Sequence, residues 1–382
     1  MINCYLAREE HAARFQIYTL QYLAEGAANI VLTIQPLLIP LTTWDNTFAV
    51  YFADEDARPL PPIEGKVLRL GKDVPNAPTC KIISKNFEDN IKPMFDEKHI
   101  VSHELVYMDA SVIKVLNSHL DEMDSSGRRP EARVGTRVED QECNGLLITD
   151  MSSVPGISAT MEIKPKWLLQ SPNAPPNAER CRTCAIRAQR ESKERAQGKL
   201  QNHTTRPFCP LALISGDRKT VLSIVSGRLY QGQSFKELAV QVQVQVINRV
   251  ADYLTTGPGF MLLQQLERAQ KRFDPVGILS HQCFDNYDGE DEHCSGAEMI
   301  KLAMTLRDCS MFIRVHYDGR IPAVEARLAD LDPKSEGKMK DWKWKEMALN
   351  NGGWYMGKES DRVPETLCVV AQERNKELPW YF

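Results

Sequence analysis

A predicted β-hairpin with an aspartate on either side constrains the fold of this chain more than any other feature. A helix is predicted over 297–306, and a strand over 311–316 follows it. An Asp-Gly pair then forms a tight turn, and a second strand over 322–328 returns along the first. Because the strands of a hairpin lie side by side, Asp308 before the hairpin and Asp330 after it are expected to lie close together.

Two carboxylates at one end of a hairpin suit phosphoryl transfer. This reaction needs one group that orients or deprotonates the attacking hydroxyl, and an acid that holds the magnesium ion bridging the nucleotide phosphates. A structural alternative stays open, in which Asp308 ends a helix and Asp330 serves a turn.

A Glu-Ile-Lys-Pro-Lys run follows the apolar residues of a strand predicted over 159–163. In a continuous strand Glu162, Lys164 and Lys166 would lie on one face, because strand side chains alternate with a period of two. Three charges there are costly unless they meet ligands or one another. Pro165 indicates a strand end or an edge strand, and a solvated edge is the alternative explanation.

The first 70 residues are predicted to form strands and turns, and one of the turns is rich in small residues. Residues 25–31 read Glu-Gly-Ala-Ala-Asn-Ile-Val, so backbone N–H groups there are candidates for contacts with phosphates. The turn is neither a Walker loop nor the GxGxxG loop of protein kinases, and a simple hairpin turn is the alternative. Arg69 follows in a strand predicted over 66–70 and is a candidate cation for ATP phosphates, although exposed strand arginines are common.

Periodicity predicts several further elements. Apolar residues at helical spacing predict a helix over 103–123, and a strand is predicted over 146–151. The segment after Ser234 has alternating valines, which are typical of a strand, but it also has an apolar stripe at a spacing of four. We favour a helix there, with Ser234 and Glu237 as a capping-box pair at its start.

The composition is that of an ordinary globular protein. The 382 residues are enough for two lobes, with 42% hydrophobic and 26% charged residues. No run approaches the roughly 18 apolar residues of a membrane span, and no signal-peptide pattern is present, so an intracellular protein is expected. Ten scattered cysteines favour a reducing compartment over a disulfide framework.

The charge distribution is uneven. The formal net charge of −4 gives no general attraction to nucleic acid or to an anionic membrane, and neither is expected as a partner. Two segments are nevertheless basic: 179–206 has eight Lys or Arg and three Glu, and 334–345 has five Lys and two acids. These segments form either solvated faces or a pocket for a polyanion.

These motifs together resemble the inositol-pentakisphosphate 2-kinases of the fungal type. Residues 25–31 resemble the phosphate loop of that family, and 161–166 resemble its Glu-Ile-Lys-Pro-Lys signature. Residues 307–310 and 330–334 resemble its paired aspartate motifs, in the same order. The resemblance runs from residue 22 to about residue 345.

The resemblance implies an α+β, two-lobed kinase-like fold with an ATP cleft between the lobes. Residues 1–150 would form a smaller N-lobe of antiparallel sheet plus helix, which carries the nucleotide phosphate loop. Residues 151–382 would form a larger α/β C-lobe, which binds the inositol phosphate and carries the catalytic residues.

The resemblance also implies roles for individual residues. Asp308 and Lys164 would be catalytic, with Asp308 acting on the 2-hydroxyl, and Asp330 would bind magnesium. The nucleotide would be contacted by Gly26, Ala27, Ala28, Asn29, Ile30, Val31, Arg69 and Glu162, with Asp150 as a candidate adenine contact. The substrate would be bound by Arg133, Lys164, Lys166, Arg190, Lys334, Lys338 and Trp342.

Three positions depart from the family pattern. Ala27 replaces one of two consecutive glycines, which is tolerable only where that position does not need a positive φ. An arginine expected shortly after Arg69 is missing, since Val74 occupies the approximate place and only Lys72 is near. The Asn-Asn-Leu-Arg stretch of plant and animal relatives has no counterpart.

A structural zinc ion is a further hypothesis. Cys181, Cys184, His203 and Cys209 make up a Cys₃His set with suitable spacing. A second group is at least as well explained as ordinary loop residues; it consists of His281, Cys283, His293 and Cys294.

The function implied is ATP- and Mg²⁺-dependent phosphorylation of the 2-hydroxyl of inositol 1,3,4,5,6-pentakisphosphate, which gives inositol hexakisphosphate and ADP. The alternatives are a catalytically silent inositol-polyphosphate binding protein, or a kinase for another inositol phosphate isomer or for protein. A monomer is expected. The resemblance implies a nuclear location, with the cytoplasm as the alternative.

Overall fold

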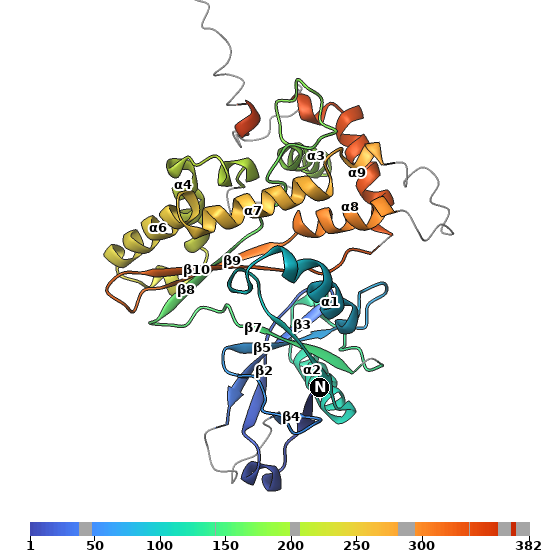
Figure 1. The fold of residues 1–382 in the computed structure, drawn as a ribbon, viewed down its shortest axis with the longest axis vertical. Helices are drawn as coiled ribbons and strands as arrows, with labels where there is room; N and C mark the ends of the chain where they lie inside the picture. The colour runs from blue at the N-terminus through green and yellow to red at the C-terminus, as the bar shows by residue number, and fades with distance from the viewer. Residues whose placement is uncertain are drawn as a thin grey trace, which may run out of the picture. The chain divides into compact units, whose positions relative to one another are not determined.

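The computed structural model describes residues 1–37, 48–141, 143–198, 207–281, 295–335, 337–357 and 368–371. The chain divides into two compact units, Met1–Asp150 (unit 1) and Met151–Phe382 (unit 2), which are drawn in Figure 1. Both units combine sheet and helix, which confirms the α+β class. Among the described residues, no helix is both long and apolar enough to cross a membrane.

Unit 1 is built on a closed barrel with the strand order β1-β4-β2-β3-β5-β7-β6. Its strands are β1 (Ile2–Leu6), β2 (Ile17–Glu25), β3 (Asn29–Pro36), β4 (Ala49–Asp54), β5 (Lys66–Gly71), β6 (His103–Met108) and β7 (Asn144–Thr149). A parallel pairing of β1 with β6 closes the barrel, and the other pairs are antiparallel. Inward-facing apolar side chains form the core together with α2 (Ala110–Ser125). A short helix, α1 (Cys80–Asn86), continues into a π-helix over Phe87–Ile91.

The predicted helix over 103–123 is wrong in its first part. His103–Met108 forms β6, and the helix begins only at Ala110. The spacing of the apolar residues suits either structure, and pairing with β1 and β7 decides for the strand. Asp109 marks the change, since its side chain accepts a hydrogen bond from the Ser111 backbone N–H and caps α2.

Unit 2 contains a three-stranded sheet in the order β10-β9-β8. Its strands are β8 (Ser158–Ile163), β9 (Ser310–His316) and β10 (Ala323–Ala329). Its helices are α3 (Arg182–Ala196), α4 (Arg218–Leu229), α5 (Gln233–Lys236), α6 (Val240–Thr255), α7 (Pro258–Phe273), α8 (Ser295–Leu306) and α9 (Lys338–Asn351). Figure 1 shows α4, α6, α7 and α8 on the same side of this sheet.

The predicted hairpin and the helix before it are confirmed as β9, β10 and α8. Ser310 pairs with Ala329, so Asp308 and Asp330 leave the hairpin at the same end. The strand β8 is an edge strand, as Pro165 indicated.

The helix favoured after Ser234 is confirmed as α6, but the predicted capping pair is wrong. Ser234 lies inside the short helix α5, and α6 starts at Val240 without a side-chain cap. The buried Gln243 amide holds the segment between α5 and α6 instead, because it donates to the carbonyl oxygens of Phe235, Lys236 and Leu238 at 3.0–3.2 Å.

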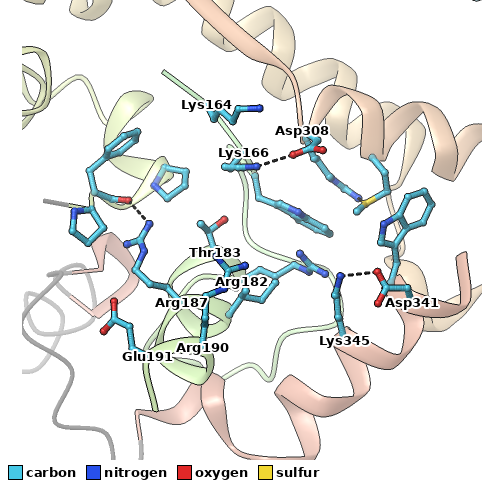
Figure 2. A pocket seen from close by; sticks show the side chains of 18 of the residues that line it. Lys164, Lys166, Arg182, Thr183, Arg187, Arg190, Glu191, Asp308, Asp341 and Lys345 are labelled. Carbon is cyan, nitrogen blue, oxygen red and sulfur yellow. Dashed lines mark hydrogen bonds and ion pairs between the residues drawn. The ribbon is translucent and has the colours of Figure 1, made fainter. Parts of the chain in front are cut away.

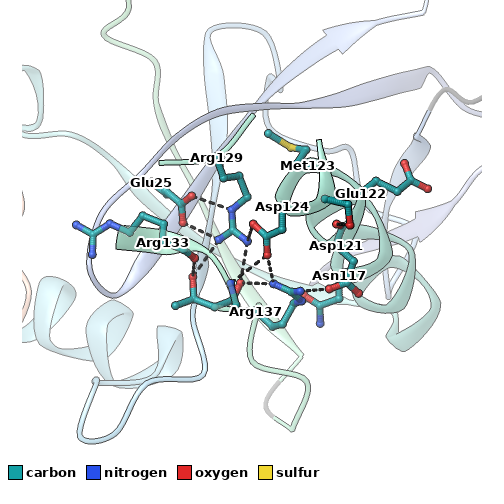
Figure 3. A network of polar contacts seen from close by, with 12 residues as sticks. Glu25, Asn117, Asp121, Glu122, Met123, Asp124, Arg129, Arg133 and Arg137 are labelled. Atoms are coloured by element: carbon teal, nitrogen blue, oxygen red, sulfur yellow. Dashed lines mark hydrogen bonds and ion pairs between the residues drawn. The ribbon is translucent and has the colours of Figure 1, made fainter. Parts of the chain in front are cut away.

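A buried ion network ties the end of β2 to the rest of unit 1 (Figure 3). The Glu25 carboxylate accepts two hydrogen bonds from Arg129, each 2.9 Å long, and forms an ion pair with Lys72. All three side chains are 0% exposed. Arg129 also contacts Asp124 at 3.0 Å, which in turn binds Arg137 at 2.9 Å. One carboxylate thus holds two buried cations.

The network fixes the charge of Glu25. Burial raises the pKa of this carboxyl, but hydrogen bonds from Arg129, Lys72 and Tyr22 outweigh burial and lower the pKa to about 2 from the usual 4.5. The folded-state pKa lies below the unfolded one. The contribution of Glu25 to stability is therefore fully present above pH 4.5 and is lost as the pH falls towards 2.

Glu25→Gln is expected to destabilise unit 1 by about 3–5 kcal/mol, because it leaves Lys72 and Arg129 buried without their counter-charge. Urea unfolding at neutral pH measures this loss, and the difference from the wild type should shrink as the pH falls below 4.5. The control is Lys85→Met, which breaks an exposed pair with Asp89 and should cost less than about 1 kcal/mol. A Glu25→Gln variant as stable as this control would contradict the network's role.

Candidate functional site

The glycine turn between β2 and β3 is held by backbone contacts and by Lys72. The Gly26 N–H donates to the Asn29 carbonyl at 2.9 Å. Lys72 holds the turn twice, because its backbone N–H donates to the Ala28 carbonyl at 2.8 Å and its Nζ to the Gly26 carbonyl at 2.9 Å. Ala27 is not among the residues with a positive φ, so alanine strains nothing at this departure from the family pattern.

The other candidates in unit 1 lie on neighbouring elements. Arg69 on β5 pairs in register with Val31 on β3, and only 7% of its surface is exposed. Arg133 ends a 3₁₀ turn (Glu131–Arg133), and Figure 3 shows its guanidinium pointing away from the Arg129 network. The backbone N–H of Asp150 donates to the Gly65 carbonyl at 2.8 Å.

In unit 2 the predicted acids and lysines meet in ion pairs. Asp308 accepts hydrogen bonds from Lys166 at 2.7 Å and from Lys334 at 2.8 Å, and Figure 2 shows the first of these. Lys164 lies 3.2 Å from Asp330. These residues come from three segments far apart in the sequence, which the ends of β8, β9 and β10 bring together. Nearby, Glu162 accepts a hydrogen bond of 2.6 Å from the Ser310 hydroxyl.

The three predicted charges on one strand face are not arranged as expected. The strand β8 ends at Ile163, and Lys166 has φ of 54°, which is left-handed backbone. Asp330 has φ of 57° and is in the same region. Residues other than glycine occupy this region at a cost of about 1–2 kcal/mol, so the surrounding structure must hold both backbones in place. The chain therefore turns after Ile163, where a continuous strand through Lys166 was predicted.

The two lysines keep Asp308 ionised. Burial raises the pKa of its carboxyl, but the hydrogen bonds from Lys166 and Lys334 outweigh burial and lower the pKa to about 2. For Lys164, burial lowers the pKa, but the neighbouring Asp330 outweighs it and the net shift is upward. Asp308 and Lys164 are thus both charged at neutral pH.

A cavity of about 780 Å³ opens in unit 2 and is strongly basic. Ten Lys or Arg side chains and five acidic side chains line it. The predicted residues among its walls are Glu162, Lys164, Lys166, Arg190, Asp308, Lys334, Lys338 and Trp342. Both basic segments found in the sequence contribute to these walls, through α3 and α9. A polyanion is the ligand that such a cavity suits.

Five basic residues of the cavity were not predicted from the sequence as site residues. They are Arg182, Arg187, Arg228, Arg307 and Lys345. Arg307 lies in the 307–310 motif, and Arg182, Arg187 and Lys345 lie in the two basic segments, but no pattern in the sequence indicated that their side chains line one cavity.

Two of these arginines stack on Trp167. The guanidinium carbons of Arg307 and Arg182 lie 3.6 and 4.3 Å from the centroid of this ring. Arg307 is paired with Asp274 at 2.6 Å, and Arg182 with Glu346 at 2.5 Å. These fully buried carboxylates make the two arginines part of the cavity's framework.

Four cysteines of unit 2 form a compact buried cluster. They are Cys181, Cys184, Cys209 and Cys368, and their sulfurs all lie within 4.8 Å of one another. The Cys181–Cys209 and Cys209–Cys368 Sγ distances are 3.7 and 3.8 Å. Four sulfurs at about 2.3 Å from a tetrahedral zinc ion would be about 3.8 Å apart, so the cluster fits this metal.

The cluster differs from the predicted zinc set in one ligand. The structure adds Cys368, and the predicted His203 lies outside the described residues. Cys283, His293 and Cys294 of the second group lie outside them too. His281 is described, and its Nε2 is 3.4 Å from Asp274.

Comparisons with known proteins bear on this cavity and on the whole chain. The profile of the inositol-pentakisphosphate 2-kinase family matches residues 22–348. The inositol-pentakisphosphate 2-kinase of Yarrowia lipolytica is 30% identical over 214 residues, which are 56% of this chain and 57% of that protein. The aligned region thus spans little more than half the length of this relative. Since the family profile covers most of both units, the chain belongs to the inositol-pentakisphosphate 2-kinase family.

Proposed function

We propose that this protein transfers the γ-phosphate of ATP to the 2-hydroxyl of inositol 1,3,4,5,6-pentakisphosphate, giving inositol hexakisphosphate and ADP. The observation that carries the proposal is the basic cavity around Asp308, in a chain that belongs to this kinase family. Each phosphate group of such an acceptor carries a charge of roughly −1.5 to −2, and the excess of cations in the cavity suits it.

The proposed reaction starts at Asp308, whose carboxylate accepts the proton of the 2-hydroxyl. The oxygen then attacks the γ-phosphorus, while the bond from this phosphorus to the bridging oxygen of ADP breaks. Asp330, with Glu162 in support, would bind the Mg²⁺ ion that neutralises the leaving ADP. The carboxylates of Asp308 and Asp330 both attract Lys164. Its ammonium group would contact the transferred phosphoryl group.

The remaining predicted residues complete the proposal. In unit 1 the Gly26–Val31 turn and Arg69 would contact the ATP phosphates, Asp150 the adenine, and Arg133 an acceptor phosphate. In unit 2 the acceptor phosphates would be bound by Lys164, Lys166, Arg190, Lys334 and Lys338, beside Trp342. The two-lobed kinase arrangement with a nucleotide cleft, a nuclear location and a monomeric state belong to the same proposal, on the family resemblance.

A catalytically silent binding protein is less well supported. A protein that only binds a polyanion gains nothing from carboxylates at the wall of the cavity, yet Glu162 and Asp308 are both there. A transferase needs these acids for the hydroxyl and for the metal ion.

Asp308→Ala should lower turnover by roughly 10²–10⁴-fold, because the variant lacks the group that accepts the hydroxyl proton. The assay is incubation with Mg²⁺-ATP and inositol 1,3,4,5,6-pentakisphosphate, followed by anion-exchange separation of the products. Asp341→Asn is the control, since Asp341 lines the same cavity but pairs with Lys345 on its own helix. Wild-type turnover in Asp308→Ala would refute the assigned role, and no hexakisphosphate from the wild type would favour the silent binder.

We also propose that the four-cysteine cluster holds a structural Zn²⁺ ion. Cys181 and Cys184 lie at the start of α3, whereas Cys368 comes from the far C-terminal segment. The metal would therefore fasten that segment to the helix that carries Arg187 and Arg190 into the cavity. Zinc would supply cross-linking here and no step of the reaction.

Purified protein is expected to contain one zinc ion per chain by elemental analysis, and Cys368→Ser should lose it. Removal of the metal by a chelator should lower the thermal unfolding temperature, because the metal binds the folded state alone. Cys143→Ser is the control, because Cys143 lies outside the cluster, and this variant should keep its zinc. Wild-type protein purified without zinc, and unaffected by the chelator, would end the proposal.

A further inference from the structure

The basic residues of the cavity fall into two groups by their partners. Six of them face a carboxylate in the structure: Lys164, Lys166, Arg182, Arg307, Lys334 and Lys345. The other four form no ion pair with a carboxylate among the described residues: Arg187, Arg190, Arg228 and Lys338. Arg190 and Lys338 are already proposed to bind acceptor phosphates, whereas Arg187 and Arg228 have no proposed role.

Arg187 has a buried donor without a partner. It lies in the second turn of α3, and its Nη2 donates to the Phe208 carbonyl at 3.0 Å. Its Nη1 is buried and meets no hydrogen-bond acceptor in the described part of the chain. An unmet buried donor costs about 1–3 kcal/mol, and more when it is charged, so it needs an explanation.

Arg228 lies beside Arg187 around the same phenylalanine. It is in the last turn of α4, and its guanidinium carbon lies 5.5 Å from the centroid of the Phe208 ring. Burial lowers the pKa of Arg228, the carboxylate of Glu162 raises it, and the charge of Arg187 lowers it again, with a net shift downward. Two cations from different helices are thus held close enough to repel each other.

Repulsion between two half-buried guanidiniums ends when an anion binds between them. A phosphate group has enough oxygens to accept hydrogen bonds from two arginines, and the planar guanidinium suits it. Figure 2 shows Arg187 and Arg190 reaching the cavity from α3, while Lys166 and Asp308 enter from another side and Lys345 from α9. Cations on several sides suit a ligand whose phosphates surround a ring, whereas a linear triphosphate would leave some of them unmet.

We propose that Arg187 and Arg228 together form a phosphate subsite that binds one phosphate group of the inositol pentakisphosphate acceptor. This inference rests on the proposed function, because that function supplies the ligand. The subsite selects acceptors that carry a phosphate at the corresponding ring position.

The test is calorimetric titration of the full chain with inositol 1,3,4,5,6-pentakisphosphate, without ATP and at fixed ionic strength. Arg187→Gln and Arg228→Gln should each raise Kd by roughly ten- to a hundredfold. The double variant should lose less than the product of the two single effects, because both residues bind the same phosphate. In the kinase assay the KM for the acceptor should rise in parallel, with the KM for ATP within about twofold of the wild type.

Matched controls come from the same two helices. Arg195→Gln on α3 and Arg218→Gln on α4 remove the same charge outside the cavity, and both should bind like the wild type. Arg187→Gln should lower the ligand-free unfolding temperature slightly, because it loses the hydrogen bond to the Phe208 carbonyl. Arg228→Gln should leave that temperature near the wild-type value, since removal of a half-buried charge offsets the lost attraction to Glu162.

Four results would overturn the subsite. They are affinities equal to those of the controls, a KM for ATP that rises in place of the acceptor's, strictly multiplicative single effects, and a loss of ligand-free stability without a change in Kd. Wild-type protein that binds the pentakisphosphate but does not phosphorylate it would refute the kinase and leave this test intact. Wild-type protein that does not bind the pentakisphosphate would overturn both.

Discussion

The backbone pairing of β8, β9 and β10 decides where the charged groups of unit 2 lie. Ser310 pairs with Ala329, and Ile163 pairs with the residue that follows Ser310, so three strand ends meet at one edge of the sheet. Asp308 and Asp330 leave from this edge, and each finds a lysine of the segment after β8. A register slip of one residue would turn every side chain of a strand to the other face and would dissolve both pairs.

The same ion pairs link substrate binding to the strength of the proposed base. Lys166 and Lys334 hold the pKa of Asp308 at about 2, and both are also proposed to bind phosphates of the acceptor. A phosphate group that draws these lysines towards itself weakens their bonds to the carboxylate, and the pKa of Asp308 then rises. A higher pKa makes a better proton acceptor, so the carboxylate would become an effective base only when the acceptor is in place.

Local patterns predicted the hairpin, the edge strand and three of the four clustered cysteines, because each depends on residues near one another in the sequence. The sequence could not separate β6 from α2, because the apolar spacing suits both a strand and a helix. Pairing with β1, about 100 residues earlier, is what makes the first part a strand. Cys368 lies 159 residues beyond Cys209 and forms no spacing motif with it. Arg187 and Arg228 are ordinary helix residues until packing turns them to one cavity.

The place of Lys72 explains why the proposed subsite matters. The family pattern has an arginine shortly after Arg69, and Lys72 is the nearest basic residue in this chain. Lys72 is only 3% exposed, and its Nζ is held by Glu25 and the Gly26 carbonyl. It cannot reach a ligand phosphate without breaking the network that supports the glycine turn. The charge of Lys72 thus stabilises unit 1 itself, and under the proposed function recognition of the acceptor would depend all the more on the arginines of unit 2.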